Sequence, residues 1–210
     1  MKITINNVSK KIKQREVLKH INLEFESGKI YGLKGVNGSG KTMLMRLVCG
    51  LILPTKGEVL IDDKKLGKDI SFPESVGLLL EYPAFVNSYT GLKNLKMIAS
   101  LKGIISDEDI KQTLIKVGLD PNDTRKFKSY SLGMKQKLGI ACAIMENPEL
   151  LILDEPFNAL DEKSVLMVEK IIKEYKNDKR IIIISCHEKE ELEKLSDEII
   201  NISEGELINN

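Results

Sequence analysis

The sequence lacks the long hydrophobic runs that would mark a membrane-spanning or exported chain. Its longest apolar runs, such as residues 181–184, have the length of a strand and fall far short of the roughly 20 residues that a spanning helix needs. The first six residues alternate like a strand and lack the apolar core of a signal peptide. We therefore expect a cytosolic chain.

The sequence also lacks a charge excess and a cysteine framework. It has 32 basic and 31 acidic residues, so no overall field attracts nucleic acid, and we expect no nucleic-acid partner. Cys49, Cys142 and Cys186 have neither metal nor disulfide spacing, and we interpret them as small buried apolar groups. There is no internal repeat or low-complexity segment, and 210 residues suit one or at most two domains.

The most informative stretch is a glycine-rich loop that matches the pattern G-x-x-x-x-G-K-[ST]. It follows an apolar run at residues 29–33, which predicts a strand, and precedes residues 43–49, which have helical character. Without Cβ atoms, the loop glycines let successive N–H groups point inward at a phosphate, and the helix that follows adds its positive dipole end. Lys41 would reach the β- and γ-phosphates, and the Thr42 hydroxyl would hold Mg²⁺. The predicted nucleotide-binding residues are Gly35, Val36, Asn37, Gly38, Ser39, Gly40, Lys41 and Thr42.

The hydrophobic pattern predicts an α/β protein with a helical insertion. Residues 2–34 are typical of β-structure, a helical period runs from residue 90 to 146, and strand–helix alternation resumes from residue 149. We therefore expect one domain over residues 1–210, in which residues 1–88 and 147–210 form a β subdomain and a core, and residues 89–146 form a helical subdomain. A capping box at Ser106 and Asp109, a helix over residues 161–175, a charged helix over 188–196 and a closing hairpin over 199–208 are also expected.

Two neighbouring carboxylates follow the predicted buried strand at residues 150–153. Asp154 and Glu155 would stand at the C-terminal edge of a sheet, where open α/β sheets place ligand groups. Asp154 fits a partner of Mg²⁺, and Glu155 fits the general base that activates an attacking water. Such a pair can also be an ordinary strand end, but the upstream glycine loop favours the functional interpretation.

Two further positions stay open on their residues alone. His187 follows a predicted strand, and a lone histidine there is more often a surface or capping residue than a functional one. Ser131 is a natural N-cap of a helix that continues to Ile144, which is a complete structural explanation. The alternative is that the N–H groups at this helix start face an anion.

The order of these motifs resembles the ATP-binding cassette (ABC) ATPases over nearly the whole chain. The glycine loop, inserted helices, a Ser-Gly signature at residues 130–134, a strand ending in Asp154-Glu155-Pro156, Asn158–Asp161 and His187 follow one another in family order. The resemblance implies a P-loop NTPase with a RecA-like core, an N-terminal antiparallel β subdomain and an inserted α-helical subdomain. It also implies ATP and Mg²⁺ as cofactors.

The resemblance further implies a head-to-tail dimer, either of two copies of this chain, which we expect, or of this chain with a different ATPase subunit. Each ATP would lie between the P-loop of one subunit and the signature of the other, where Ser131 and the N–H of Gly133 would contact the γ-phosphate. His187 would be the switch histidine that contacts the same phosphate. Asp161 would lie in the loop that links the two sites.

Four residues depart from the usual ABC pattern. Leu132 and Met134 replace a glycine and a glutamine of the signature. Glu81 replaces a glutamine that contacts Mg²⁺ and water in the family; a carboxylate can still ligate Mg²⁺ but cannot donate a hydrogen bond. Ile12 falls where an aromatic ring usually stacks on adenine.

Because Ile12 offers only apolar contact, we expect weak discrimination between purine bases. Binding measurements should give similar affinities for ATP and GTP, and a large preference for ATP would contradict this expectation.

The signature variant, followed by Leu138-Gly139-Ile140-Ala141, looks like the ATPase subunits of bacterial exporters of peptide antibiotics, bacteriocins and related drugs. Such subunits energise a separate membrane permease from the inner face of the cell membrane. The permease would contact a groove near residues 81–95, where Tyr82, Phe85, Val86 and Tyr89 either form its apolar patch or pack inside the insert. An alternative is a soluble ABC ATPase acting on a macromolecular complex, but such proteins usually carry two cassettes or a long coiled-coil insertion.

Overall fold

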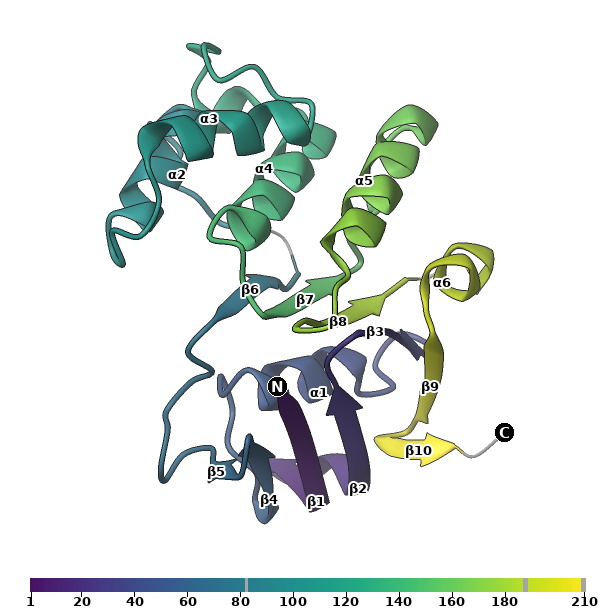
Figure 1. The fold of residues 1–210 in the computed structure, drawn as a ribbon. Helices are drawn as coiled ribbons and strands as arrows, with labels where there is room; N and C mark the ends of the chain where they lie inside the picture. Colours follow the sequence, from purple (N-terminus) through teal and green to yellow (C-terminus); the bar gives the residue numbers. More distant parts are fainter. Residues whose placement is uncertain (82, 187–188, 209–210) are drawn as a thin grey trace.

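A computed structural model describes residues 1–81, 83–186 and 189–208, which form two sheets and the helices around them (Figure 1). The strands are β1 Lys2–Ile12, β2 Arg15–Glu26, β3 Lys29–Lys34, β4 Lys56–Ile61, β5 Lys64–Lys65, β6 Val76–Leu79, β7 Leu150–Asp154, β8 Ile181–Ser185, β9 Glu198–Ser203 and β10 Glu206–Ile208. The α-helices are α1 Lys41–Val48, α2 Gly91–Ala99, α3 Asp107–Lys116, α4 Leu132–Ile144, α5 Glu162–Tyr175 and α6 Lys189–Leu195, and a short 3₁₀ turn spans Phe127–Ser129.

The larger sheet sets the positions of the functional segments. Its order is β10-β9-β3-β8-β7-β6, with parallel pairing from β9 to β6 and an antiparallel pair of β9 with β10. Because β3, β8 and β7 run in one direction, their carboxyl ends meet at one edge. The segments that follow β3 and β7 are thereby brought together although more than 100 residues separate them in the chain.

The continuous apolar runs of β7 and β8 follow from burial on both faces of this sheet. Leu150 and Ile152 of β7 pack with α1 and the smaller sheet, whereas Leu151 and Leu153 pack with the helices on the other side. All five residues of each strand are buried. A strand covered on both faces has no reason to alternate, so the sequence shows an unbroken apolar run.

The smaller sheet is antiparallel, with the order β2-β1-β4-β5. Ile3, Ile5 and Val8 of β1 are fully buried and share a core cluster with residues of α1 and of the larger sheet. Helix α1 accordingly lies between the two sheets in Figure 1. The predicted fold, with a parallel core sheet, an N-terminal antiparallel β subdomain and inserted helices, is confirmed.

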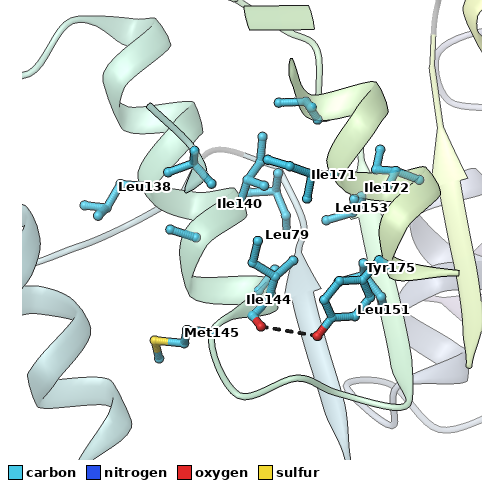
Figure 2. Packing of buried hydrophobic residues seen from close by; sticks show 14 of the residues in the cluster. Leu79, Leu138, Ile140, Ile144, Met145, Leu151, Leu153, Ile171, Ile172 and Tyr175 are labelled. Carbon is cyan, nitrogen blue, oxygen red and sulfur yellow. Dashed lines mark hydrogen bonds between the residues drawn. The ribbon is translucent and has the colours of Figure 1, made fainter. Parts of the chain in front are cut away.

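The inserted helices begin at polar caps, of which those at Ser106 and Ser131 were predicted. Ser106 and Asp109 form the expected capping box of α3, Ser131 accepts a hydrogen bond from the N–H of Met134 at the start of α4, and Thr90 caps α2 in the same way. In Figure 2, Ile144 and Ile140 of α4 face Leu79 of β6 and Leu153 of β7, and α5 closes the cluster from the other side. The Tyr175 hydroxyl donates to the Ile144 carbonyl at 3.2 Å, and burial raises the pKa of Tyr175 to about 12.

Strand β6 ends at Leu79, and Glu81 lies at a bend with a left-handed φ of 56°. One sequence-based expectation differs from the structure. The cysteines are not uniformly buried: Cys49 and Cys186 are, while Cys142 is partly exposed although burial raises the pKa of its thiol to about 11. The domain boundaries given above remain a prediction.

Gly77 allows α4 to pack against β6. An added Cβ at Gly77 would lie 1.8 Å from the carbonyl oxygen of Ala143, so β6 and α4 would have to move apart. We expect Gly77→Ala to lower the free energy of unfolding by about 3 kcal/mol in a denaturant titration.

The matched control is Gly103→Ala, because an added Cβ there meets nothing within 4 Å. Gly103 has a positive φ of 65°, so its replacement should still cost about 1 kcal/mol. Equal losses for the two variants would contradict the close approach of β6 and α4.

Candidate nucleotide-binding site

The glycine loop connects β3 to α1 and presents a helix N-terminus to the cavity it lines. Gly40 is the N-cap of α1 with a φ of 116°, a conformation that a residue with a side chain rarely adopts. Lys41 is buried, and its ammonium donates to the carbonyl oxygens of Gly35 at 2.7 Å and Val36 at 3.3 Å. The loop therefore holds a positive charge beside the first N–H groups of a helix, an arrangement that attracts an anion.

Ser39 supplies a second observation that fits a phosphate. Its side chain is 2% exposed, and its hydroxyl has no hydrogen-bond partner among the described residues although the residue lines the cavity. The Ser39 carbonyl accepts from the N–H of Gly205 at 2.8 Å, and the Gly205 carbonyl accepts from the N–H of Lys19 at 2.7 Å. The turn between β9 and β10 thus fixes the loop against β2 and leaves a donor, the Ser39 hydroxyl, for a bound group.

Asp154 joins the loop to the end of β7. One carboxylate oxygen accepts from the Thr42 hydroxyl at 2.6 Å, and the other accepts from the Ser185 hydroxyl. Asp154 is 5% exposed, so these donors compensate for the loss of water around its charge. Two of the residues predicted to hold Mg²⁺, Thr42 and Asp154, are therefore in direct contact.

Glu155, the residue after Asp154, is held in place by hydrogen bonds of its backbone. Its N–H donates to the Ser185 hydroxyl at 3.0 Å, and its carbonyl accepts from the Gln136 side chain at 2.9 Å. Its φ of 51° lies in the left-handed region, which is uncommon for a residue with a side chain. Contacts from β8 and α4 thus fix the backbone of Glu155, the predicted general base.

A cavity of about 1080 Å³ collects most of the predicted residues, enough room for a nucleotide. Its lining includes Ile12, Val36, Asn37, Gly38, Ser39, Gly40, Lys41, Thr42, Glu81, Asp154 and Glu155. Among the described residues that line it, none is aromatic, in keeping with the isoleucine at position 12. Gly35 takes part through its carbonyl contact with Lys41.

The residues of the predicted signature line a second cavity, of about 460 Å³. Ser131 and Gly133 at the start of α4 lie there with Asp161, which caps α5 by accepting from the N–H of Ser164 at 2.9 Å. Hydrogen bonds from the hydroxyl and N–H of Ser164 hold the pKa of Asp161 below its usual value. Within one chain the structure therefore separates the signature from the phosphate loop.

Glu81 lies at the rim of the first cavity in an ion pair. Its carboxylate is 2.8 Å from the guanidinium of Arg46 on α1. His187 and Tyr82 lie outside the described residues. Phe85 is half-buried and packs edge-on against Phe127 at 5.2 Å, so this part of the expected permease patch belongs to the insert's own core.

Sequence reasoning missed Ser185, Gln136, Gly205 and Arg46. Ser185 pairs in register with Asp154 in the neighbouring strand, and its signal was a polar residue closing an apolar run. The others act through contacts between distant segments, which no local pattern reveals.

The oxygen donors at the first cavity fit Mg²⁺. Within residues 1–81, 83–186 and 189–208 there is no group of three or more His, Cys, Asp or Glu side chains arranged for a metal ion. Mg²⁺ commonly binds through one or two carboxylates together with substrate phosphates and water, and so needs no such cage. The Thr42 hydroxyl and the Asp154 carboxylate match that requirement.

Comparison with known proteins decides the family. The sequence profile described as ABC transporter matches residues 18–158. The chain belongs to the ABC transporter ATP-binding family. It is 47% identical over 205 residues to the uncharacterized ABC transporter ATP-binding protein YybJ of Bacillus subtilis, covering 98% of this chain and 94% of that protein. As a member of this family it binds ATP and hydrolyses it to ADP and phosphate.

Two relatives carry more specific names. The bacitracin transport ATP-binding protein BcrA of Enterococcus faecalis is 39% identical, with 98% of this chain and 68% of that protein covered. The lantibiotic transport ATP-binding protein SrtF of Streptococcus pyogenes is 36% identical, with 98% and 89% covered.

Solved structures agree on the ABC fold. The dimeric structure of MJ0796, a bacterial ABC transporter cassette, superposes with a TM-score of 0.89 at 26% identity, over 99% of this chain and 97% of that one. A dimeric post-hydrolysis state of MJ0796 bound to ADP and Pi gives 0.88 at 24% identity, over 99% and 97%. In the part of this chain that the structure describes, the helices are too short or too polar to cross a bilayer.

The Ser185 hydroxyl contacts both the Asp154 carboxylate and the Glu155 backbone, so we expect it to matter for turnover. We expect Ser185→Ala to lower kcat for ATP about tenfold, the lower end of effects seen for groups that orient metal ligands. It should also cost about 1–2 kcal/mol of stability, since buried Asp154 loses a donor. Steady-state ATPase assays and denaturant titrations measure the two effects.

Ser75→Ala is the matched control. The Ser75 hydroxyl accepts from the N–H of Glu149 at 3.0 Å, at the opposite edge of the same sheet. This variant should keep its kcat. Unchanged turnover in Ser185→Ala would contradict the positioning role.

Proposed function

We propose that this chain is the ATP-binding subunit of a transporter whose separate membrane permease exports a peptide antibiotic, a drug or a lipid-like compound. The observation that carries the proposal is the similarity to BcrA and SrtF along nearly the whole chain. Those proteins are named for bacitracin transport and lantibiotic transport. The subunit would act at the cytoplasmic face of the membrane through the permease.

We assign the contacts that bind ATP and Mg²⁺ before hydrolysis to the first cavity. Lys41 and the loop N–H groups would bind the β- and γ-phosphates, and the Ser39 hydroxyl would complete its hydrogen bonding with a phosphate oxygen. Thr42 and Asp154 would hold Mg²⁺, and Glu81, which lines the same cavity, would be a further ligand. The ion would neutralise charge on the phosphates. Ile12 would contact the base.

Hydrolysis needs a base next to the γ-phosphate, and Glu155 is the proposed residue. Its carboxylate would orient or deprotonate the attacking water. The Glu155 N–H donates to Ser185 and the Glu155 carbonyl accepts from Gln136, so the backbone of the proposed base is held at the end of β7. We assign His187 to the γ-phosphate as the switch histidine, on the family resemblance.

A second copy of the chain would complete the site. Ser131 and Gly133 line a cavity separate from the phosphate loop, which supports a contact with the nucleotide of another subunit. Asp161 lies in that cavity, next to the signature, and would couple the two nucleotide sites of a dimer. Closure would be driven by contacts that exist only while the γ-phosphate is present. Lys41, Ser131 and His187 are the proposed sources of those contacts.

The permease would dock beside the segment that leads from Glu81 into α2. Val86 is 37% exposed there, while Asn94 is fully buried and holds the segment by bonds to the backbone of Val86 and Thr90. A segment fixed to α2 in this way would transmit a permease movement to the helical insert. Phe85 is excluded from the docking patch because it packs within the insert.

The proposal is tested in the host cell. We expect deletion of the gene to raise sensitivity to bacitracin or to a lantibiotic at least fourfold, measured as minimum inhibitory concentration against a panel of both classes. Wild-type complementation should restore resistance, and Glu155→Gln should not. Tagged wild-type chain purified from detergent-solubilised membranes should bring down a polytopic membrane protein.

The control is complementation with Ser75→Ala, which changes a serine away from both cavities. Unchanged sensitivity to every compound, together with recovery of the tagged chain without any membrane protein, would overturn the exporter proposal.

A further inference from the structure

Glu81 brings an additional negative charge to the rim of the nucleotide cavity. Asp154 and Glu155 already line this cavity, and ATP would add the negative charges of its phosphates. The cavity is also lined by Glu16 and Glu204 and by the cations Arg15, Lys19 and Lys41. Among the described residues that line it, Glu81 is thus one of five carboxylates, and it repels the ATP phosphates unless a cation compensates it. A cation paired with Glu81 would therefore favour ATP binding.

Arg46 is placed to be that partner. It lies on α1 four residues after Thr42, so the two side chains share a face of the helix one turn apart. Its terminal nitrogen donates to the Glu81 carboxylate at 2.8 Å. Arg46 thus links α1, the helix that follows the phosphate loop, to Glu81.

The side chains of Arg46 and Glu81 differ in how far they are buried. The side chain of Arg46 is 33% exposed, and its Nε is buried without a hydrogen-bond partner among the described residues, whereas the side chain of Glu81 is 59% exposed. Glu81 also has a left-handed φ of 56°, a conformation that surrounding contacts must maintain. Arg46 is thus the more buried member of the pair, and the more exposed carboxylate is the member free to be oriented by it.

We propose that Arg46 is a positioning residue for Glu81, whose charge it neutralises and whose carboxylate it holds at the rim of the ATP cavity. The pair also ties α1 to the segment that enters the helical insert. Because a partly exposed ion pair is weak, the carboxylate can exchange partners when a cation enters the cavity. The inference rests on the proposed place of ATP in the first cavity.

A double-mutant cycle in ATP binding tests the proposal on the purified full chain. Affinities for ATP are measured by isothermal titration calorimetry in EDTA, so that only the charges of the protein act on the phosphates, and again with Mg²⁺. We expect Arg46→Ala to weaken ATP binding in EDTA about fivefold, the size expected for a partly exposed charge pair. Arg46→Ala/Glu81→Gln should return to within about twofold of Glu81→Gln alone, since the uncompensated charge is gone.

Two further variants keep the result interpretable. Arg46→Lys retains the charge and should bind ATP within about twofold of wild type, while Arg46→Gln, which keeps most of the side-chain packing, should lose affinity like Arg46→Ala. Melting temperatures show whether any variant is misfolded. If Arg46→Ala weakens ATP binding as much in the Glu81→Gln background as in wild type, the proposal is overturned, because the effect of a merely structural arginine does not depend on the charge of residue 81.

The same assay separates this proposal from the assignment of ATP to the first cavity. Lys41→Ala should bind ATP poorly if that assignment is right. Weak binding by Lys41→Ala together with an additive cycle would reject only the role of Arg46. Normal binding by Lys41→Ala would reject the cavity assignment itself.

Discussion

The hydrogen bond between the Thr42 hydroxyl and the Asp154 carboxylate is the contact on which the site depends. It joins the first turn of α1 to the end of β7 across the carboxyl edge of the parallel sheet. Asp154 is almost fully buried, and a buried carboxylate is costly unless its oxygens are satisfied. Thr42 on one side and Ser185 on the other meet that need, so the folded core brings the two predicted Mg²⁺-binding groups together before any ligand arrives.

The order of the strands in the sheet brings Thr42 and Asp154 together and keeps the signature away from the phosphate loop. Strand β8 lies between β3, which leads into the phosphate loop, and β7, which ends in Asp154. Ser185, the last residue of β8, donates a hydrogen bond to Asp154. The helical insert starts from β6 at the far side of β7, which carries the signature at the start of α4 away from the loop. Within one chain the phosphate loop and the signature therefore line separate cavities, and the proposed head-to-tail dimer would join them.

Local sequence determined much of this arrangement. The glycine loop, the strand that ends in Asp154 and the caps at Ser106 and Ser131 follow from turn chemistry and hydrophobic period, and these were predicted. Ser185 and Gln136 could not be predicted, because their roles depend on strand register and on where α4 crosses β7. The pairing of Arg46 with Glu81 was missed for the same reason: the residues are 35 positions apart and meet only in the folded chain.

The central claim is that two copies of this chain complete each ATP site. The most direct measurement is the solution mass of Glu155→Gln by light scattering, with and without Mg²⁺ and ATP, because loss of the base should trap the closed state. We predict an ATP-dependent shift from monomer to dimer, which Ser131→Arg in the same background should prevent by blocking the signature without touching the first cavity. A monomer at saturating ATP, with calorimetry showing that ATP is bound, would contradict the claim.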